Sequence, residues 1–289
     1  MAFDGVYVAI VTPFTADFEV DYEGLRAHAD WLIREGVHGL VPTGTCGEYA
    51  QLSADERARV VETVADVARG RVPIVVGVAA PTTAQVVHWA EHARGVGAEA
   101  VMALPPINYR SSWPEVLAYY RSVGAVGLPI VVYNNPYDTG TDITAERLHE
   151  LEQEAPVVAV KEFSQDVRRL SEIREVSAMA LIAGADDLVV ESIHAGASGW
   201  IAGMANIVPG PSVELYGLAA TGRWDEAWAL YRRMLPLLRF DTGPRLVQAI
   251  KYGMRAIGRP VGDTRPPRLP LPPEDGARID RVLSTLAVR

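Results

Sequence analysis

The stretch that decides the fold reads Pro156-Val157-Val158-Ala159-Val160-Lys161-Glu162. Four consecutive small or β-branched apolar residues indicate a short buried strand over residues 157–160. An ionisable side chain directly after such a run is costly to bury unless the protein uses it. Lys161 is therefore the first candidate for a functional residue.

Lysine is rare in this chain, which makes the choice of residue at position 161 informative. Among the 27 lysines and arginines, only Lys161 and Lys251 are lysines. Arginine could serve in any salt bridge, but only a primary amine can deprotonate and attack a carbonyl carbon. Lys161 is a candidate for an imine-forming residue. The alternative is a structural lysine that ends the strand and pairs with Glu162, in a chain whose arginine content reflects base composition.

Short apolar strands of the same kind alternate with amphipathic helical stretches along the chain. The eight candidate strands cover residues 6–11, 39–42, 74–78, 100–104, 130–133, 157–160, 180–183 and 199–202. Their spacing of about 20–35 residues corresponds to one βα unit each. Nearly continuous apolar strands indicate a parallel sheet covered by helices. Eight such units predict an α/β fold, a (β/α)₈ TIM barrel, over residues 1–222.

Start and stop signals mark the helices between these strands. Capping boxes are expected at Ser53, Thr82 and Ser112. Glycines that end helices are expected at Gly36, Gly70 and Gly95.

The pattern changes after Pro209. Helices are predicted at residues 213–220, 224–238, 244–257 and 274–286, with no strand between them. The first helix closes the barrel, and residues 223–289 form a C-terminal helical appendage packed on it. Residues 259–273 are rich in proline and are expected to form an extended surface segment.

Composition and charge exclude several function classes. The chain has 289 residues, 49% of them hydrophobic, which is typical of a soluble globular protein with a large core. A net charge of −9 argues against nucleic acid as a partner. No apolar run reaches the ~18 residues that span a bilayer, so no membrane association is expected. The start of the chain lacks the basic segment of a secretory signal.

Neither a metal nor a cofactor is predicted. The single cysteine, Cys46, excludes an intrachain disulfide, and we expect the protein to be cytoplasmic. The six histidines show no metal-site pattern. Neither a phosphate-binding P-loop nor a dinucleotide fingerprint is present.

Active sites of such barrels lie at the carboxyl ends of the strands, and three of these ends carry candidate chemistry. Gly44-Thr45-Cys46-Gly47-Glu48 follows the second strand and forms either a loop of exposed N–H groups suited to a carboxylate or a plain turn. Tyr133, at the end of the fifth strand, relays protons or only packs. Together with Lys161 after the sixth strand, this loop and Tyr133 suit a 2-oxo acid or its imine, held as a Schiff base.

Cys46 has two interpretations. It could be a nucleophile, but no histidine lies near it in the sequence as a base. A binding role is favoured.

The motifs at residues 44–48, Tyr133-Asn134-x-Pro136 and Val160-Lys161-Glu162 resemble the three signatures of the dihydrodipicolinate synthase / N-acetylneuraminate lyase family. Their order and spacing agree over nearly the whole chain. The resemblance implies a metal-free TIM barrel with a C-terminal helical region, usually a homotetramer (a dimer of dimers). It implies that Lys161 forms the Schiff base, that Tyr133 and Thr45 relay protons, and that Cys46 binds the substrate carboxylate. Further expected substrate-binding residues are Gly44, Ile201, Tyr109 and Gly184.

The sequence departs from the synthase pattern at three places. Asp138 stands where the synthase has an arginine that holds the carboxylate of its aldehyde substrate. The tyrosine pair after strand four is replaced by residues 105–109, so the relay tyrosine is absent or displaced to Tyr109. Cys46 replaces a threonine. These differences argue against synthase activity.

Other segments resemble one branch of the family, 1-pyrroline-4-hydroxy-2-carboxylate deaminase. They are residues 134–136, 166–169, 184–187, 199–204 and 264–269. The expected function is a Schiff-base lyase acting on a small 2-oxo acid or cyclic imino acid, with deamination to 2,5-dioxopentanoate and ammonia as the leading hypothesis. The alternatives are a 2-keto-3-deoxy sugar acid aldolase or dehydratase, 4-hydroxy-tetrahydrodipicolinate synthase, and a non-catalytic binding protein on the same fold.

Overall fold

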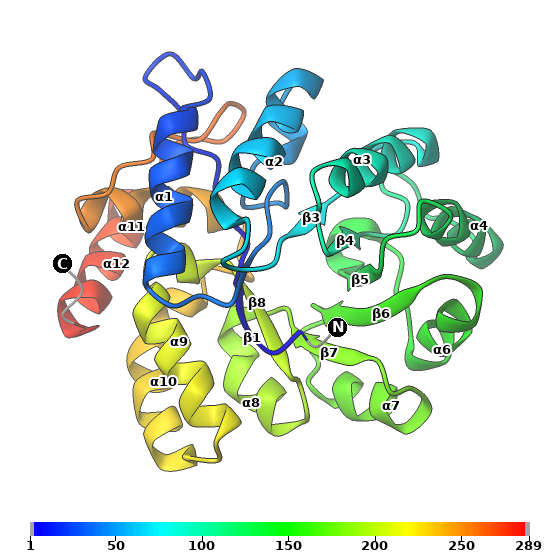
Figure 1. Ribbon diagram of the computed structural model, residues 1–289. Helices are drawn as coiled ribbons and strands as arrows, with labels where there is room; N and C mark the ends of the chain where they lie inside the picture. Colours follow the sequence, from blue (N-terminus) through cyan, green and yellow to red (C-terminus); the bar gives the residue numbers. More distant parts are fainter. Residues whose placement is uncertain (1–2, 287–289) are drawn as a thin grey trace.

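Eight parallel strands form a barrel with helices around it (Figure 1). The computed structural model describes residues 3–286. Neighbouring strands follow the order β2-β1-β8-β7-β6-β5-β4-β3, and a parallel bridge between Leu40 and Ile74 joins the two ends. The strands are β1 Gly5–Val8, β2 Gly39–Leu40, β3 Val75–Gly77, β4 Ala100–Ala103, β5 Ile130–Asn134, β6 Val157–Glu162, β7 Ala180–Ala183 and β8 Gly199–Ala202. The predicted (β/α)₈ barrel is confirmed.

Strand ends differ from the prediction in a way that matters for the site. The predicted fifth and sixth strands stop before Asn134 and Lys161, whereas β5 and β6 include them. The reason is a continuous ladder, in which Tyr133 pairs with Lys161 and Asn134 with Glu162. Strands β1 to β4 end earlier than predicted, because the extended chain that follows them already turns into the loops of the barrel mouth.

The helices begin largely where the capping signals placed them. Their bounds are α1 Tyr22–Arg34, α2 Ala54–Ala68, α3 Thr83–Gly95, α4 Trp113–Gly124, α5 Pro136–Thr139, α6 Ala145–Glu154, α7 Arg168–Val176, α8 Val189–His194, α9 Pro209–Ala220, α10 Trp224–Leu238, α11 Leu246–Ala256 and α12 Pro273–Leu286. Three 3₁₀ turns are η1 Tyr49–Gln51, η2 Asp186–Leu188 and η3 Met204–Asn206.

Two of the three predicted capping boxes are confirmed. Ser53 exchanges both hydrogen bonds with Glu56, at 2.8 and 3.2 Å, and Ser112 N donates to Glu115 Oε2 at 2.7 Å. Thr82 accepts from Gln85 N but lacks the reciprocal bond, because its hydroxyl donates to the Gln85 side chain instead.

One of the three predicted helix stops is wrong. Gly36 and Gly70 follow their helices with positive φ, as expected. Gly95 is still part of α3, and Gly97, with φ of 83°, takes the left-handed position after that helix.

The C-terminal helices gather at one side of the barrel (Figure 1). Helix α10 packs against α8, α9 and α12, and α11 packs against α12 and η3. Helix α9 begins four residues before its predicted start, since Pro209 at its first turn needs no hydrogen-bonded N–H. Residues 287–289 of the predicted appendage lie outside the described residues, and the division at residue 222 stays a prediction.

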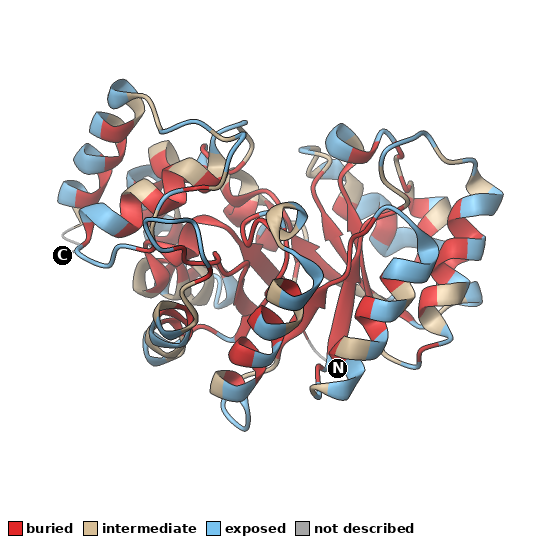
Figure 2. Cartoon of the chain, turned by 90° about the horizontal axis from the view of Figure 1, so that it is seen from above, coloured by how far each residue is buried: buried red, intermediate tan, exposed pale blue. Residues whose placement is uncertain are grey.

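The core lies between the strands and the inner faces of the helices. Figure 2 shows the strands buried in the middle, while the outer faces of the helices are exposed. In helices such as α1, buried residues recur every three to four positions, as at Leu25, Ala29 and Leu32, which matches the helical period. Within residues 3–286, no helix combines the length and apolar character that crossing a bilayer requires.

Candidate active site

Strand register brings Tyr133 and Lys161 together. They are direct partners on β5 and β6, and the Lys161 Nζ lies 4.1 Å from the centroid of the Tyr133 ring. Side chains alternate between the two faces of a strand, so Asn134 and Glu162, the next pair, point the other way. Two dipeptides that are distant in the sequence thus place an amine and a phenol on one face and an amide and a carboxylate on the other.

Lys161 and Tyr133 open onto a cavity of about 410 Å³ at the carboxyl ends of the strands. Gly44, Thr45 and Cys46 line the same cavity, so five predicted site residues meet there. The remaining lining residues are Ala9, Met102, Asn135, Tyr137, Asp138, Phe163, Gln165, Gly203, Asp241, Thr242, Gly243, Pro244, Leu246, Val247, Gln248 and Arg268. A cavity of this size accommodates a small organic acid.

The Gly44–Glu48 loop is held tightly against β3. Thr43, which precedes the loop, and Glu48, its last residue, have φ of 57° and 54°. A Cβ at Gly77 would lie only 2.5 Å from the Thr43 carbonyl oxygen, so only glycine permits this approach. The Thr12 hydroxyl donates to the Gly47 carbonyl at 2.7 Å. The loop is therefore preorganised before any ligand enters.

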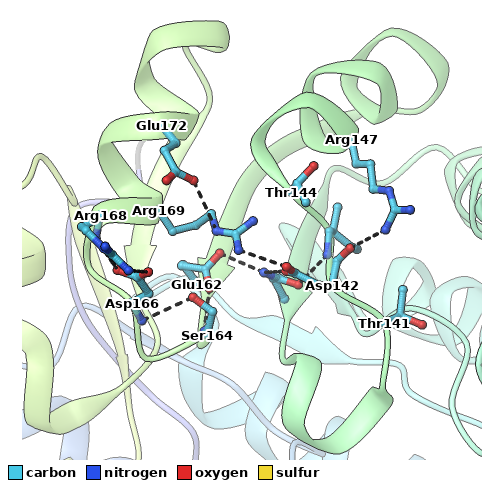
Figure 3. A network of polar contacts seen from close by, with 12 residues as sticks. Thr141, Asp142, Thr144, Arg147, Glu162, Ser164, Asp166, Arg168, Arg169 and Glu172 are labelled. Atoms are coloured by element: carbon cyan, nitrogen blue, oxygen red, sulfur yellow. Dashed lines mark hydrogen bonds and ion pairs between the residues drawn. The ribbon is translucent and has the colours of Figure 1, made fainter.

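A polar network holds the outer faces of β5 and β6 (Figure 3). Asn134 Nδ2 donates to Glu162 Oε2 at 3.0 Å, and Asn134 Oδ1 accepts from Ile143 N at 3.0 Å. Glu162 Oε1 accepts from Ser164 N at 2.6 Å. Arg169 pairs with Asp142 at 3.0 Å and extends the network to α7. These contacts fix the backbone on which Tyr133 and Lys161 stand.

The charge of Lys161 depends on its neighbours. Burial lowers the pKa of Lys161, but ionised Tyr133, Asp241, Cys46 and Asp186 would raise it, and the net direction is upward. Burial also raises the pKa of the Tyr133 phenol and of the Cys46 thiol, so both are neutral near pH 7. Asp241 and Asp186 are then the neighbours that favour the charged form of Lys161, although burial raises the pKa of both carboxyl groups, that of Asp186 to about 6.

Two charged residues of the cavity were not anticipated from the sequence. Asp241 comes from the segment between α10 and α11 and is buried. Arg268 comes from the proline-rich segment, where its guanidinium lies 3.4 Å from Glu48 Oε2 and donates to Gln51 Oε1 at 2.9 Å. Neither residue follows a strand, so the strand-end rule that found the others gives no signal for them.

Three predicted substrate-binding residues lie outside the cavity lining. Ile201 is buried on β8 opposite Tyr7. Gly184 is needed for packing, because a Cβ there would lie 2.4 Å from the Glu162 carbonyl oxygen. Tyr109 is 53% exposed and lines a separate pocket with Pro106. Tyr109 therefore does not line the cavity of Lys161 within one chain.

The described residues offer no evident place for a metal. No three His, Cys, Asp or Glu side chains between residues 3 and 286 are grouped so that they could hold an ion. The site is built from an amine, a phenol, a loop with a hydroxyl and a thiol, two carboxylates and a guanidinium.

A barrel with a buried lysine and a tyrosine at neighbouring strand ends is the arrangement expected of a class I aldolase-type Schiff-base lyase. Comparisons with known proteins agree. The Dihydrodipicolinate synthetase family matches residues 2–286. The 4-hydroxy-tetrahydrodipicolinate synthase of Methanococcus vannielii is 32% identical over 98% of this chain and 99% of its own. The chain belongs to the dihydrodipicolinate synthetase family and is an enzyme of this lyase class.

Solved structures of the family have the same fold. A putative dihydrodipicolinate synthetase from Pseudomonas aeruginosa superposes with a TM-score of 0.94 at 35% identity, over 98% of this chain and 99% of that one. The chloride-inhibited dihydrodipicolinate synthase of Acinetobacter baumannii, complexed with pyruvate, gives a TM-score of 0.94 at 26% identity, over 99% of this chain and 100% of that one.

Proposed function

We propose that this lyase deaminates 1-pyrroline-4-hydroxy-2-carboxylate or a closely related cyclic imino acid, with Lys161 as the covalent centre. The observation that carries the proposal is the charge of the cavity wall. Asp138 and Asp241 line the cavity together with Lys161 and Arg268. Asp138, held near the Tyr133 hydroxyl through Asn135, disfavours a second substrate carboxylate at that position and favours a substrate that has one carboxylate and a protonatable ring nitrogen.

The residues have distinct roles in this reaction. The Lys161 amine adds at C2 of the pyrroline, and the C2–N ring bond breaks to give an iminium ion on Lys161 and a free amine at C5, while the loop at Thr45 and Cys46 holds the carboxylate. Tyr133 acts as the acid–base group that relays the C3 proton to the C4 hydroxyl group, so the resulting enamine expels that group as water. Water then releases 2,5-dioxopentanoate and ammonia, and the free lysine is restored.

The second candidate is 4-hydroxy-tetrahydrodipicolinate synthesis, which the names of the curated relatives favour. Asp138 argues against it. Its carboxylate lines the cavity and accepts from Asn135 Nδ2 at 2.7 Å, and the same amide lies 3.3 Å from the Tyr133 hydroxyl. A fixed negative charge beside the reacting groups disfavours a second substrate carboxylate. A 2-keto-3-deoxy sugar acid aldolase or dehydratase would use the same imine.

A direct comparison of two reactions on one preparation tests the assignment. With 4-hydroxy-pyrroline-carboxylate the enzyme should release ammonia, and with pyruvate and aspartate semialdehyde it should condense the two poorly or not at all. Efficient condensation without ammonia release would assign the synthase reaction and would show that another residue, such as Arg268, holds the second carboxylate.

We also propose a homotetramer, as the family resemblance implies. The exposed Tyr109 and the neighbouring pocket of Pro106, Glu115 and Tyr119 offer a surface for a second copy. Light scattering should give a mass four times the 31.3 kDa of one chain. A monomeric mass would contradict this assembly.

A further inference from the structure

Asp241 is a buried carboxylate on the cavity wall that the reaction scheme above does not use. Its Oδ2 accepts a hydrogen bond from the Asp186 backbone N–H at 2.9 Å, which fixes the carboxyl group. The other oxygen, Oδ1, lies over Gly203. A Cβ added at Gly203 would lie 3.0 Å from this oxygen and 3.5 Å from the Cys46 Sγ. The missing side chain at Gly203 thus leaves room between Asp241 and the predicted carboxylate-binding loop.

Lys161 and Asp241 share the cavity without closing into an ion pair. Within the described residues Lys161 makes no ion pair with a carboxylate, whereas Lys251 lies 2.9 Å from Glu48 Oε1. Lys161 is instead placed over the Tyr133 ring. Lys161 and Asp241 both line the cavity, so a substrate bound there lies close to both residues.

The surroundings of Asp241 make it a proton acceptor. The neighbouring Asp186 side chain accepts hydrogen bonds from Trp200 Nε1 at 2.8 Å and from Met204 N at 2.7 Å, which favour its charged form, while burial raises its pKa to about 6. Burial and the charge of Asp186 raise the pKa of Asp241 well above its usual range, and Lys161 acts in the opposite direction. The charged or titratable groups facing this cluster are Lys161, Tyr133, Cys46, Asp138, Asp186, Asp187 and Arg268.

We propose that Asp241 is the acid–base partner of Lys161. It takes the proton that Lys161 must lose before attack and passes it to the group that leaves C2. The proposal rests on the Schiff-base role of Lys161, but it does not depend on which 2-oxo or imino acid is the physiological substrate.

The proton balance is complete without any other reactant. With a 2-oxo acid, the Lys161 ammonium gives one proton to Asp241 through a water molecule in the cavity, because the two groups are not in direct contact, and the neutral Nζ forms the C–N bond at C2. Asp241 protonates the carbonyl oxygen, accepts a second proton from nitrogen and delivers it to the same oxygen. The C–O bond then breaks and water leaves. The nitrogen keeps one proton in the iminium ion, and Asp241 is a carboxylate again.

The test uses pyruvate as the probe and measures the rate of borohydride-trapped adduct formation between pH 6 and 9. Internal proton transfer conserves the number of protons on the pair, so the wild-type rate should be nearly independent of pH around neutrality. In the Asp241→Asn variant, Lys161 must lose its proton to bulk water, because the asparagine amide cannot accept it. Its rate should be about 100-fold lower at pH 7 and should rise with pH. Asp241→Glu should recover part of the loss.

Asp187→Asn is the matched control, because Asp187 is a half-buried carboxylate on η2, next to Asp186, and does not line the cavity. It should keep the wild-type rate and pH profile. A wild-type or faster rate for Asp241→Asn at pH 7 would mean that Asp241 only holds the proton on Lys161, and would overturn the proposal. A tenfold rise per pH unit in the wild type near neutrality would do the same, even if the variant failed to fold. If the wild-type enzyme is trapped with pyruvate but releases no ammonia from 4-hydroxy-pyrroline-carboxylate, the deaminase assignment is refuted and the proposal for Asp241 is not.

Discussion

The two lysines of this chain show how burial and pairing separate a reactive amine from a structural one. Lys251 is buried in an ion pair with Glu48 and donates to the Asp263 carbonyl at 3.0 Å. Lys161 is equally buried, but it faces the cavity and makes no such pair in the described residues. Both residues stand out in the sequence because lysine is rare in this chain. Only the structure shows that Lys251 has a structural role, in an ion pair with Glu48.

Replacing Lys161 with Arg should abolish the borohydride-trapped adduct and turnover while leaving the fold intact. The positive charge remains, but the guanidinium cannot act as a nucleophile at neutral pH. Peptide mass spectrometry should locate the wild-type adduct on Lys161, with Lys251 as the only other lysine. The control variant Lys251→Arg should keep the adduct, although it strains a buried site. Normal turnover by Lys161→Arg would refute the mechanism.

Cys46 should act in binding and not as a nucleophile. Its thiol is buried, and burial together with the charge of Asp241 raises its pKa, which opposes formation of a thiolate. Cys46→Thr and Cys46→Ser should therefore retain at least about a tenth of the wild-type kcat, because a hydroxyl can replace the thiol as a weak donor. Steady-state kinetics of both variants are the measurement. Complete inactivity of both, with circular dichroism unchanged, would favour a covalent thiol.

At the scale of the elements, the strand ends of β5 and β6 illustrate what could be predicted from sequence. Apolar runs and turn signals located every strand, and the residues after the runs identified Tyr133 and Lys161. The role of Asn134 and Glu162 could not be inferred, because it depends on the register between two strands whose sequences lie 28 residues apart. Register is set by packing of the whole barrel and leaves no local pattern.

Asn134→Ala should destabilise the protein and disturb the site together. It removes the partners of the buried Glu162 carboxylate and of the Ile143 N–H, and burial already raises the pKa of Glu162. We expect a loss of about 2–4 kcal/mol in the free energy of unfolding. Urea denaturation is the measurement. Glu172→Ala is the control, because the Glu172 side chain is 58% exposed and lies 3.6 Å from Arg169, so its loss should cost less than about 1 kcal/mol. Equal losses of unfolding free energy in the two variants would show that the Asn134 network does not stabilise the fold.

At the scale of the whole molecule, the C-terminal segments complete the cavity. Asp241 and Arg268 reach the barrel mouth from beyond residue 222, where the sequence predicted only an appendage. Arg265 anchors this segment, since its backbone N–H donates to Glu48 Oε2 at 3.1 Å and its guanidinium donates to Gln51 O at 2.7 Å. The contacts join residues more than 200 positions apart, so no periodicity or short motif could disclose them. The fold was predictable from local patterns, whereas the electrostatics of the site were not.

The closure of the barrel depends on a neutral histidine. Asn206 in η3 accepts from Val11 N at 3.1 Å and donates to the Ala9 carbonyl at 2.9 Å, which joins the end of β8 to the end of β1. His28 on α1 lies 2.9 Å from the same Asn206 Oδ1 and is buried. Burial lowers the pKa of His28 to about 4, so its imidazole is neutral in the folded protein near pH 7 and its Nε2–H donates a hydrogen bond to the amide oxygen.

This histidine should make the whole molecule sensitive to acid. The unfolded chain binds a proton at His28 near pH 6.5, and the folded chain does so only near pH 4. Below pH 6.5 the unfolded state therefore binds more protons than the folded state. The free energy of unfolding decreases as the pH is lowered from 6.5 to about 4. Between pH 7 and 4.5 the contribution is about 2–3 kcal/mol of unfolding free energy. Urea denaturation at both pH values should show that His28→Gln loses this part of the pH dependence, although it is less stable at pH 7. The exposed His149, replaced by Gln, should behave as the wild type. An unchanged acid sensitivity in His28→Gln would place the responsible proton elsewhere and would remove the argument that barrel closure is coupled to this imidazole.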